Sequence, residues 1–153
     1  MSYYVPVIIA FIVVSLINSY LDFRTLHISA ILNYAGLLVC FLLVLFIKPS
    51  ALLYHLSGGG LLFLIFFIVR LLTHKGLGWG DIHYSLLCGF VSALKGFIFC
   101  ALLSSFAGIL YFLFLRFVLK KENAFKSKIP FIPMMFIGTI AGLPLSDYMM
   151  SLL

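Results

Sequence analysis

Two aspartates stand out as residues that could do chemistry, because both border long apolar runs. Asp81 closes the glycine-rich stretch Gly76-Leu77-Gly78-Trp79-Gly80-Asp81, and Asp22 follows the first apolar run of the chain. A carboxylate in such surroundings is costly unless it is paired or used. Two carboxylates that lie close together share a proton and titrate as a pair. Such a pair can activate a water and polarise a carbonyl, which is the chemistry of aspartic proteases.

The composition places these aspartates in a membrane protein. The chain has 153 residues, of which 65% are hydrophobic and 9% charged, and its mean hydropathy is +1.27. Apolar runs of about 20 residues recur, and this length crosses a bilayer. We therefore expect one all-α, polytopic transmembrane domain over residues 1–153. The net charge of +6 comes mainly from short loops, which indicates contact with the headgroups of the lipid bilayer and no nucleic-acid partner.

Six spans joined by short loops are predicted. They cover roughly residues 3–21, 28–47, 51–72, 82–94 and 97–119, and a sixth starts after Pro130 or Pro133. Eight of the ten Lys and Arg residues lie in or beside the first, third and fifth loops. This bias places those loops in the cytoplasm and both termini outside. Asp22 and Asp81, which are 59 positions apart (81 minus 22), then share one membrane face.

Local turns are predicted from glycine. Lys95-Gly96 is expected to connect the fourth and fifth spans, and the stretch that ends at Asp81 is expected to be a loop. Gly80 directly precedes Asp81, so we expect its backbone angles to aim the carboxylate. A positive φ there would suit glycine and exclude β-branched residues.

These segments resemble the type IV prepilin peptidases, a family of aspartyl membrane proteases with two catalytic aspartates. The second aspartate of the family lies in a Gly-x-Gly-Asp motif, matched by Gly78-Trp79-Gly80-Asp81, and Gly76 matches a further glycine of the wider pattern. The first aspartate begins an Asp-x-Arg segment, matched by Asp22-Phe23-Arg24. A late Ile-Pro-Phe-Gly-Pro motif is matched in part by Ile129-Pro130-Phe131-Ile132-Pro133.

The sequence departs from the family pattern at four positions. Ser29 and Ala30 replace a Pro-Asn pair, Ile132 replaces a glycine, and His83 stands where a lysine is common. Many bacterial members also carry an N-terminal methyltransferase portion with two Cys-x-x-Cys pairs. This chain contains no such pair, so the resemblance is to the peptidase core and implies cleavage without N-methylation.

The resemblance implies a multi-pass aspartyl endopeptidase of a prokaryotic inner membrane. It would cut short, basic leaders from membrane-inserted prepilin-like precursors, such as type IV pilins or pseudopilins, at the cytoplasmic face. Asp22 and Asp81 would share the general-base and general-acid roles, and Gly76, Gly78 and Gly80 would shape the active-site loop. The residues that bind the leader and the oligomeric state are left open.

Two non-enzymatic interpretations also remain open. A small proton-coupled transporter could use the two aspartates as a relay, and a degenerate peptidase could serve as an assembly partner. A relay does not need the glycine-rich stretch, and the sequence shows no inverted repeat. The three cysteines, Cys40, Cys88 and Cys100, lie in apolar runs and are expected to pack there. The histidines have no ligand-like spacing, so no metal and no cofactor are expected.

Overall fold

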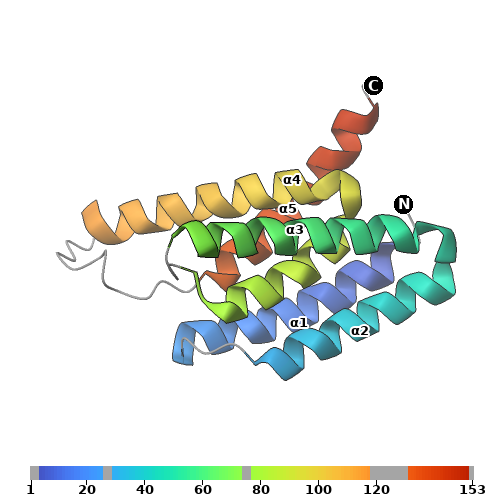
Figure 1. Cartoon of the computed structure of the whole chain (residues 1–153), viewed down its shortest axis with the longest axis horizontal. Coiled ribbons are helices and arrows are strands. Elements are labelled where there is room, and N and C mark those ends of the chain that lie inside the picture. The colour runs from blue at the N-terminus through green and yellow to red at the C-terminus, as the bar shows by residue number, and fades with distance from the viewer. Residues whose placement is uncertain (1–3, 26–28, 74–76, 118–130, 152–153) are drawn as a thin grey trace.

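The computed structural model describes residues 4–25, 29–73, 77–117 and 131–151, and the regular structure within these ranges is helical. Its elements are α1 (Tyr4–Thr25), α2 (Ala30–Ile47), the 3-10 turn η1 (Pro49–Ala51), α3 (Leu52–Leu72), α4 (Trp79–Phe117) and α5 (Ile132–Ser151). The helices form one bundle in which the ends of α1 and α3 and the starts of α4 and α5 gather at the left of Figure 1. The predicted all-α class is confirmed.

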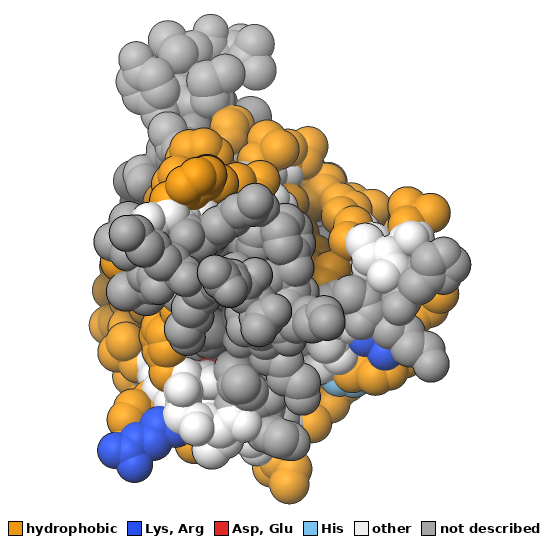
Figure 2. All heavy atoms as spheres, turned by 90° about the vertical axis from the view of Figure 1, so that its left-hand side faces the viewer, with side chains coloured by type: hydrophobic (Ala, Val, Ile, Leu, Met, Phe, Trp, Pro, Cys, Tyr) orange, Lys and Arg blue, Asp and Glu red, His pale blue; other side chains and the backbone are white. Residues whose placement is uncertain are grey.

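The outer surface of the bundle is apolar and suits contact with lipid. Large apolar side chains point outward along the helices, and Ile31 and Phe46 are 83% and 81% exposed. Figure 2 views the end where α1 finishes and α4 begins, and shows hydrophobic side chains around the flank with Lys and Arg at the rim. The stretches long and apolar enough to cross a membrane are Val5–Thr25, Ala30–Ile47, Pro49–Leu72 and Trp79–Tyr111, and a shorter apolar helix covers Ile132–Leu143. The chain is a multi-pass membrane protein, while six crossings and their orientation stay predictions.

α4 consists of two helices that run in opposite directions (Figure 1). They meet at Ala93, where φ is 54° and ψ is −175°, so the chain reverses two residues before the predicted Lys95-Gly96 turn. Gly58 on α3 leaves room for this reversal, because a Cβ there would come within 2.3 Å of the Ala93 carbonyl carbon. Next to the reversal, His55 on α3 donates from Nδ1 to the carbonyl of Phe90 at 2.6 Å. A buried carbonyl near an interrupted helix thereby keeps a partner.

The same glycine contact holds α3 against the first half of α4. A Cβ on Gly89 would lie 2.5 Å from the carbonyl oxygen of Gly58, so the two backbones touch as they do at small-residue crossings in membranes. Large buried side chains fill the space around this crossing, among them Leu62, Tyr84 and Phe90. The crossing fixes the first half of α4, and therefore Asp81 at its start, relative to the rest of the bundle.

Candidate active site

The buried face of α1 changes from apolar to polar toward its C-terminal end. Val7 and Phe11 are buried at the N-terminal end, and Ser15, Asn18 and Asp22 follow at intervals of four, three and four residues. This spacing keeps all five side chains on one face of the helix. Polar side chains inside a membrane bundle are costly and mark sites of function or polar pairing. The polar half of this face, which ends at Asp22, is therefore a candidate site.

Hydrogen bonds to other helices fix the rotation of α1. The Tyr84 hydroxyl on α4 donates to Oγ of Ser15 at 2.7 Å. One turn further along, Nδ2 of Asn18 donates to Oδ1 of Asn33 on α2 at 2.8 Å. Both bonds are buried, and buried polar groups are hydrogen-bonded because leaving them unpaired is costly. The two bonds hold the polar face inward and so direct Asp22 into the bundle.

Asp22 lies at the N-terminus of α5. Its side chain is 4% exposed, and its Oδ2 accepts a hydrogen bond from the backbone N–H of Ile132 at 3.1 Å. The first N–H groups of a helix have no partner within the helix, and this end carries a partial positive charge that favours a carboxylate. Asp22 therefore caps a helix that begins 110 residues later in the chain.

Asp81 has the same relation to the N-terminus of α4. The helix begins at Trp79, so Gly80 and Asp81 belong to its first turn, and the prediction that both lie in a loop is wrong. Oδ2 of Asp81 accepts from the backbone N–H of Gly78 at 3.1 Å. A side chain at the third helical position that reaches back to the N-cap N–H is half of a capping box. This bond accounts for the early start of α4.

Gly78 and Gly80, the described glycines of the glycine-rich stretch, do not have a positive φ. None of the glycines that the structure describes has a positive φ, so the expectation that Gly80 needs one is wrong. Position 78 has little room for a side chain, because a Cβ there would lie 2.9 Å from Oδ2 of Asp81. The space occupied by the Asp81 carboxylate is the space that a side chain at position 78 would fill. Gly76 lies outside the described residues.

The structure brings the two aspartates together at one end of the bundle. Their carboxylates lie within range of a direct electrostatic interaction. Asp22 is buried and Asp81 is partly exposed. Two negative charges at close range repel each other, and a shared proton relieves the repulsion. Helix N-termini behind both carboxylates favour the remaining negative charge. This arrangement is suited to give and take protons.

A cluster of aromatic and basic side chains at the start of α4 was missed by the sequence analysis. Arg70, at the end of α3, donates from Nη1 to the carbonyl of Leu77, and its guanidinium lies 4.7 Å from the ring centroid of Trp79. The rings of Trp79 and His83 stack at 6.0 Å, and Nδ1 of His83 shares a 2.9 Å hydrogen bond with the Tyr34 hydroxyl. The interval of four between Trp79 and His83 was a usable clue. The contact of Arg70 joins separate helices, and spacing along one helix does not reveal it.

Within the described ranges, no three His, Cys, Asp or Glu side chains gather as a group that could hold a metal ion. The three cysteines are free and buried, as expected of packing residues. The absence of a metal and of a cofactor from the working protein stays a prediction.

An apolar helical bundle with a pair of aspartates at one end defines a multi-pass membrane protein with a carboxylate site. A model of the type IV leader peptidase family matches residues 9–113, a range that contains both Asp22 and Asp81. The match covers more than half of the 153 residues, and the chain belongs to the type IV leader peptidase family. Comparison with curated proteins gives no match, and comparison with solved structures gives none.

Proposed function

We propose that this protein is an aspartyl endopeptidase that removes leaders from prepilin-like precursors, with Asp22 and Asp81 as its catalytic pair. One observation carries the proposal: two aspartates from different helices approach each other at the end of the bundle, and each caps a helix N-terminus. Family membership supports peptidase activity. The aspartic mechanism rests on the carboxylate pair, because among the described residues it is the site that the polar face of α1 leads to.

The pair would work by dividing the two proton-transfer roles of peptide hydrolysis. The ionised carboxylate takes a proton from a water, and the water oxygen bonds to the scissile carbonyl carbon. The protonated carboxylate gives its proton to the carbonyl oxygen. As the C–N bond breaks, the first carboxylate passes the proton that it took from water to the leaving nitrogen, and the second recovers a proton from a hydroxyl of the tetrahedral intermediate. Asp22 is held by the backbone N–H of Ile132 and Asp81 by that of Gly78. Both aspartates are therefore positioned before substrate arrives, and either can begin the cycle as the base.

The proposed setting is the cytoplasmic face of a prokaryotic inner membrane. The lysine and arginine bias supports a cytoplasmic location for the end that carries the aspartates, and the proposal includes six crossings with both termini outside. Arg24 and Arg70 both lie close to this end, at the finish of α1 and of α3. The substrates would be membrane-inserted precursors of the type IV pilin or pseudopilin class, which would serve pilus assembly or secretion.

The decisive test is replacement of each aspartate by asparagine. Asparagine keeps the size of the side chain but cannot exchange the proton, so Asp22→Asn and Asp81→Asn are each expected to lose cleavage of a purified type IV pilin precursor by at least about a hundredfold. Membrane insertion and elution from size-exclusion chromatography in detergent serve as controls for folding. Near-normal cleavage by either variant would remove that aspartate from the pair.

The transporter and assembly-partner alternatives give different results in the same preparation. A transporter would show proton-dependent uptake in sealed vesicles and no cleavage. A degenerate peptidase would bind the precursor without shortening it. The match to a leader peptidase family favours cleavage over both.

A further inference from the structure

Two buried asparagines form a polar pair between α1 and α2, inside the helical bundle. Asn18 is fully buried and Asn33 is 2% exposed, and Nδ2 of Asn18 donates to Oδ1 of Asn33 at 2.8 Å. This single hydrogen bond uses one polar atom of each amide group. Oδ1 of Asn18 and Nδ2 of Asn33 have no hydrogen-bond partner among the residues that the structure describes. The pair therefore presents one unused acceptor and one unused donor.

We propose that the Asn18–Asn33 pair binds a water molecule one helical turn from Asp22, and that this water supplies the hydrolytic reaction at the carboxylate pair. The ligand is water, which is the second substrate of an endopeptidase. The role of the water in hydrolysis rests on the proposed function, whereas its binding rests on the two asparagines.

The first argument is the cost of leaving these two atoms unpaired inside a membrane bundle. A buried amide group without a hydrogen bond loses its hydration and gains nothing in return, and lipid tails cannot supply a partner. The conclusion does not depend on how the two amides are turned. If both are turned over, the hydrogen bond reverses and one carbonyl oxygen and one NH2 group are still left over. Ser19, which follows Asn18 on α1, adds a third buried atom of this kind, its Oγ.

The second argument is that a water molecule matches the two unused atoms in chemistry and in reach. Water can donate to Oδ1 of Asn18 and accept from Nδ2 of Asn33 at the same time. Each of these atoms is two covalent bonds from an atom of the hydrogen bond that joins the pair, so they are at most about 7 Å apart. One or two water molecules span such a distance. Small side chains, Ser15 and Ser19, flank Asn18 on α1.

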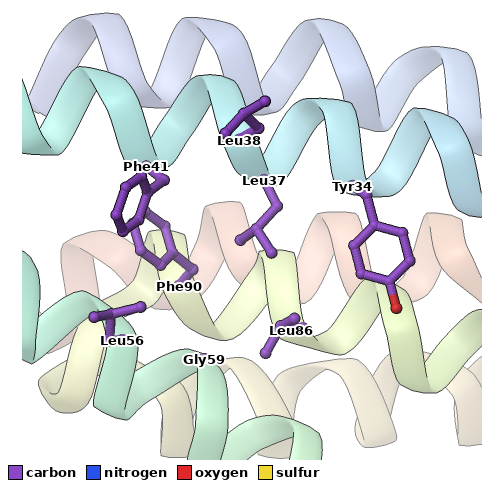
Figure 3. A pocket seen from close by; sticks show the side chains of 8 residues that line it. All are labelled: Tyr34, Leu37, Leu38, Phe41, Leu56, Gly59, Leu86 and Phe90. Carbon is purple, nitrogen blue, oxygen red and sulfur yellow. The ribbon is translucent and has the colours of Figure 1, made fainter.

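The other side of α2 offers the pair no polar partner. There α2 borders a groove with apolar walls, lined among others by Tyr34, Leu37 and Phe41 (Figure 3). The nearest hydroxyl in sequence to Asn33 is that of Tyr34, and it is used at a distance from the pair, because it shares a 2.9 Å hydrogen bond with His83 on α4. The unused atoms of the asparagine pair therefore need a partner from outside the chain.

The third argument is the position of the pair relative to Asp22. Asn18 precedes Asp22 by four residues, so the two side chains lie on one face of α1 and about 6 Å apart along its axis. Asp22 is 4% exposed, and hydrolysis consumes one water for each bond that is cut. A water held by the asparagines is already inside the bundle and one helical turn from the carboxylate that is proposed to use it.

Binding of the water is tested without any assay of activity. In the ¹⁵N-labelled protein in lipid bilayers, solid-state NMR measures how fast magnetisation passes from water to each amide group. The side-chain amides of Asn18 and Asn33 are expected to receive it quickly. The backbone amide of Phe11, which is fully buried on the same helix, serves as the control and should receive it slowly. Asparagine signals as slow as that of Phe11 would overturn the water site.

The role of the water is tested by replacing both asparagines with leucine, which has a similar size and the same branching. The double variant Asn18→Leu with Asn33→Leu leaves no unpaired amide, so its thermal unfolding should occur at or above the parental temperature. Its kcat for a type IV pilin precursor is expected to fall about tenfold, the loss expected for one hydrogen bond that holds the water. KM should stay at the parental value.

The matched control is Thr139→Val, which removes another buried contact between helices, the 2.9 Å contact of Oγ1 with Sγ of Cys100. Its kcat should stay at the parental value. A parental kcat in the double leucine variant would overturn the role of the water, and so would an equal loss in Thr139→Val, since any buried polar contact would then have the same effect. If the parent protein cuts no precursor, the proposed function fails, and the NMR measurement still decides whether the water is bound.

Discussion

Replacement of Gly78 by alanine is expected to displace the Asp81 carboxylate while leaving α4 in place. The new Cβ would lie 2.9 Å from Oδ2 of Asp81, whereas ordinary contacts begin at 3.4 Å. The carboxylate is the movable end of a side chain, so it must retreat by about 0.5 Å, the difference between these distances, and its 3.1 Å bond from the Gly78 N–H weakens. Because Gly78 does not have a positive φ, alanine fits the backbone.

The size of the effect follows from that displacement. A misplacement of about 1 Å at a catalytic group costs on the order of a hundredfold in rate, so about half that distance corresponds to roughly tenfold. The loss should appear in kcat, because Asp81 is proposed to act in the bond-breaking step. KM should stay near the parental value. The measurement is the initial rate of leader cleavage by purified protein in detergent, at several precursor concentrations.

The matched control for this variant is Gly60→Ala. A Cβ on Gly60 meets nothing within 4 Å, so this change adds the same methyl group without a clash and should leave kcat unchanged. Thermal unfolding of both variants should match that of the parent. If Gly78→Ala cleaves at the parental kcat, the position of the Asp81 carboxylate does not limit the reaction, and the argument from this contact is refuted.

Two further predictions follow from contacts near the pair, and a third follows from the proposed topology. Arg70→Gln should lower kcat several-fold, because the Leu77 carbonyl and the Trp79 ring both lose their contact with the guanidinium. Arg70→Lys should recover little of this loss, since an ammonium group cannot stack flat on an aromatic ring. Ile132→Pro should cleave about tenfold more slowly than Ile132→Ala. Proline suits the first helical position but lacks the backbone N–H from which Asp22 accepts its hydrogen bond. Equal cleavage rates for the two variants would show that this hydrogen bond does not contribute to catalysis. A cysteine at Ser50 should react with an impermeant thiol reagent on intact cells and one at Thr25 should not; the reverse pattern would invert the proposed topology.

The membrane bundle was predictable because its cause is local. Apolar runs of spanning length need no tertiary information, and Lys48-Pro49 marks the predicted stop between the second and third spans, where α2 ends at Ile47. The reversal in α4 was misplaced because its cause is distant. Glycine is common in turns, so the reversal was expected at Gly96. The chain turns instead at Ala93, beside Gly58 on α3. Only the packed structure shows which of these residues meet.

The candidate site divides in the same way. The two aspartates could be found from residue type, flanking glycines and loop charge, because these are properties of the sequence itself. Their partners could not, since Asp22 and Asp81 are held by backbone N–H groups, which every residue except proline carries. The role of Gly78 was also hidden, because it depends on where the Asp81 side chain points. The sequence therefore indicated the two aspartates as a candidate pair, but it did not indicate the backbone groups that orient their carboxylates.

The bond between Asp22 and Ile132 has a consequence for the timing of synthesis. The two residues are 110 positions apart, and a ribosome that adds 5–20 residues per second needs about 6 to 22 s to travel between them. During that interval the growing chain can insert α1 and begin to pack it, but Asp22 has no α5 to cap. We expect a nascent chain to cut no substrate until α5 enters the membrane. An incomplete peptidase beside newly made membrane proteins would then cut none of them, and insertion of α5 would complete the site.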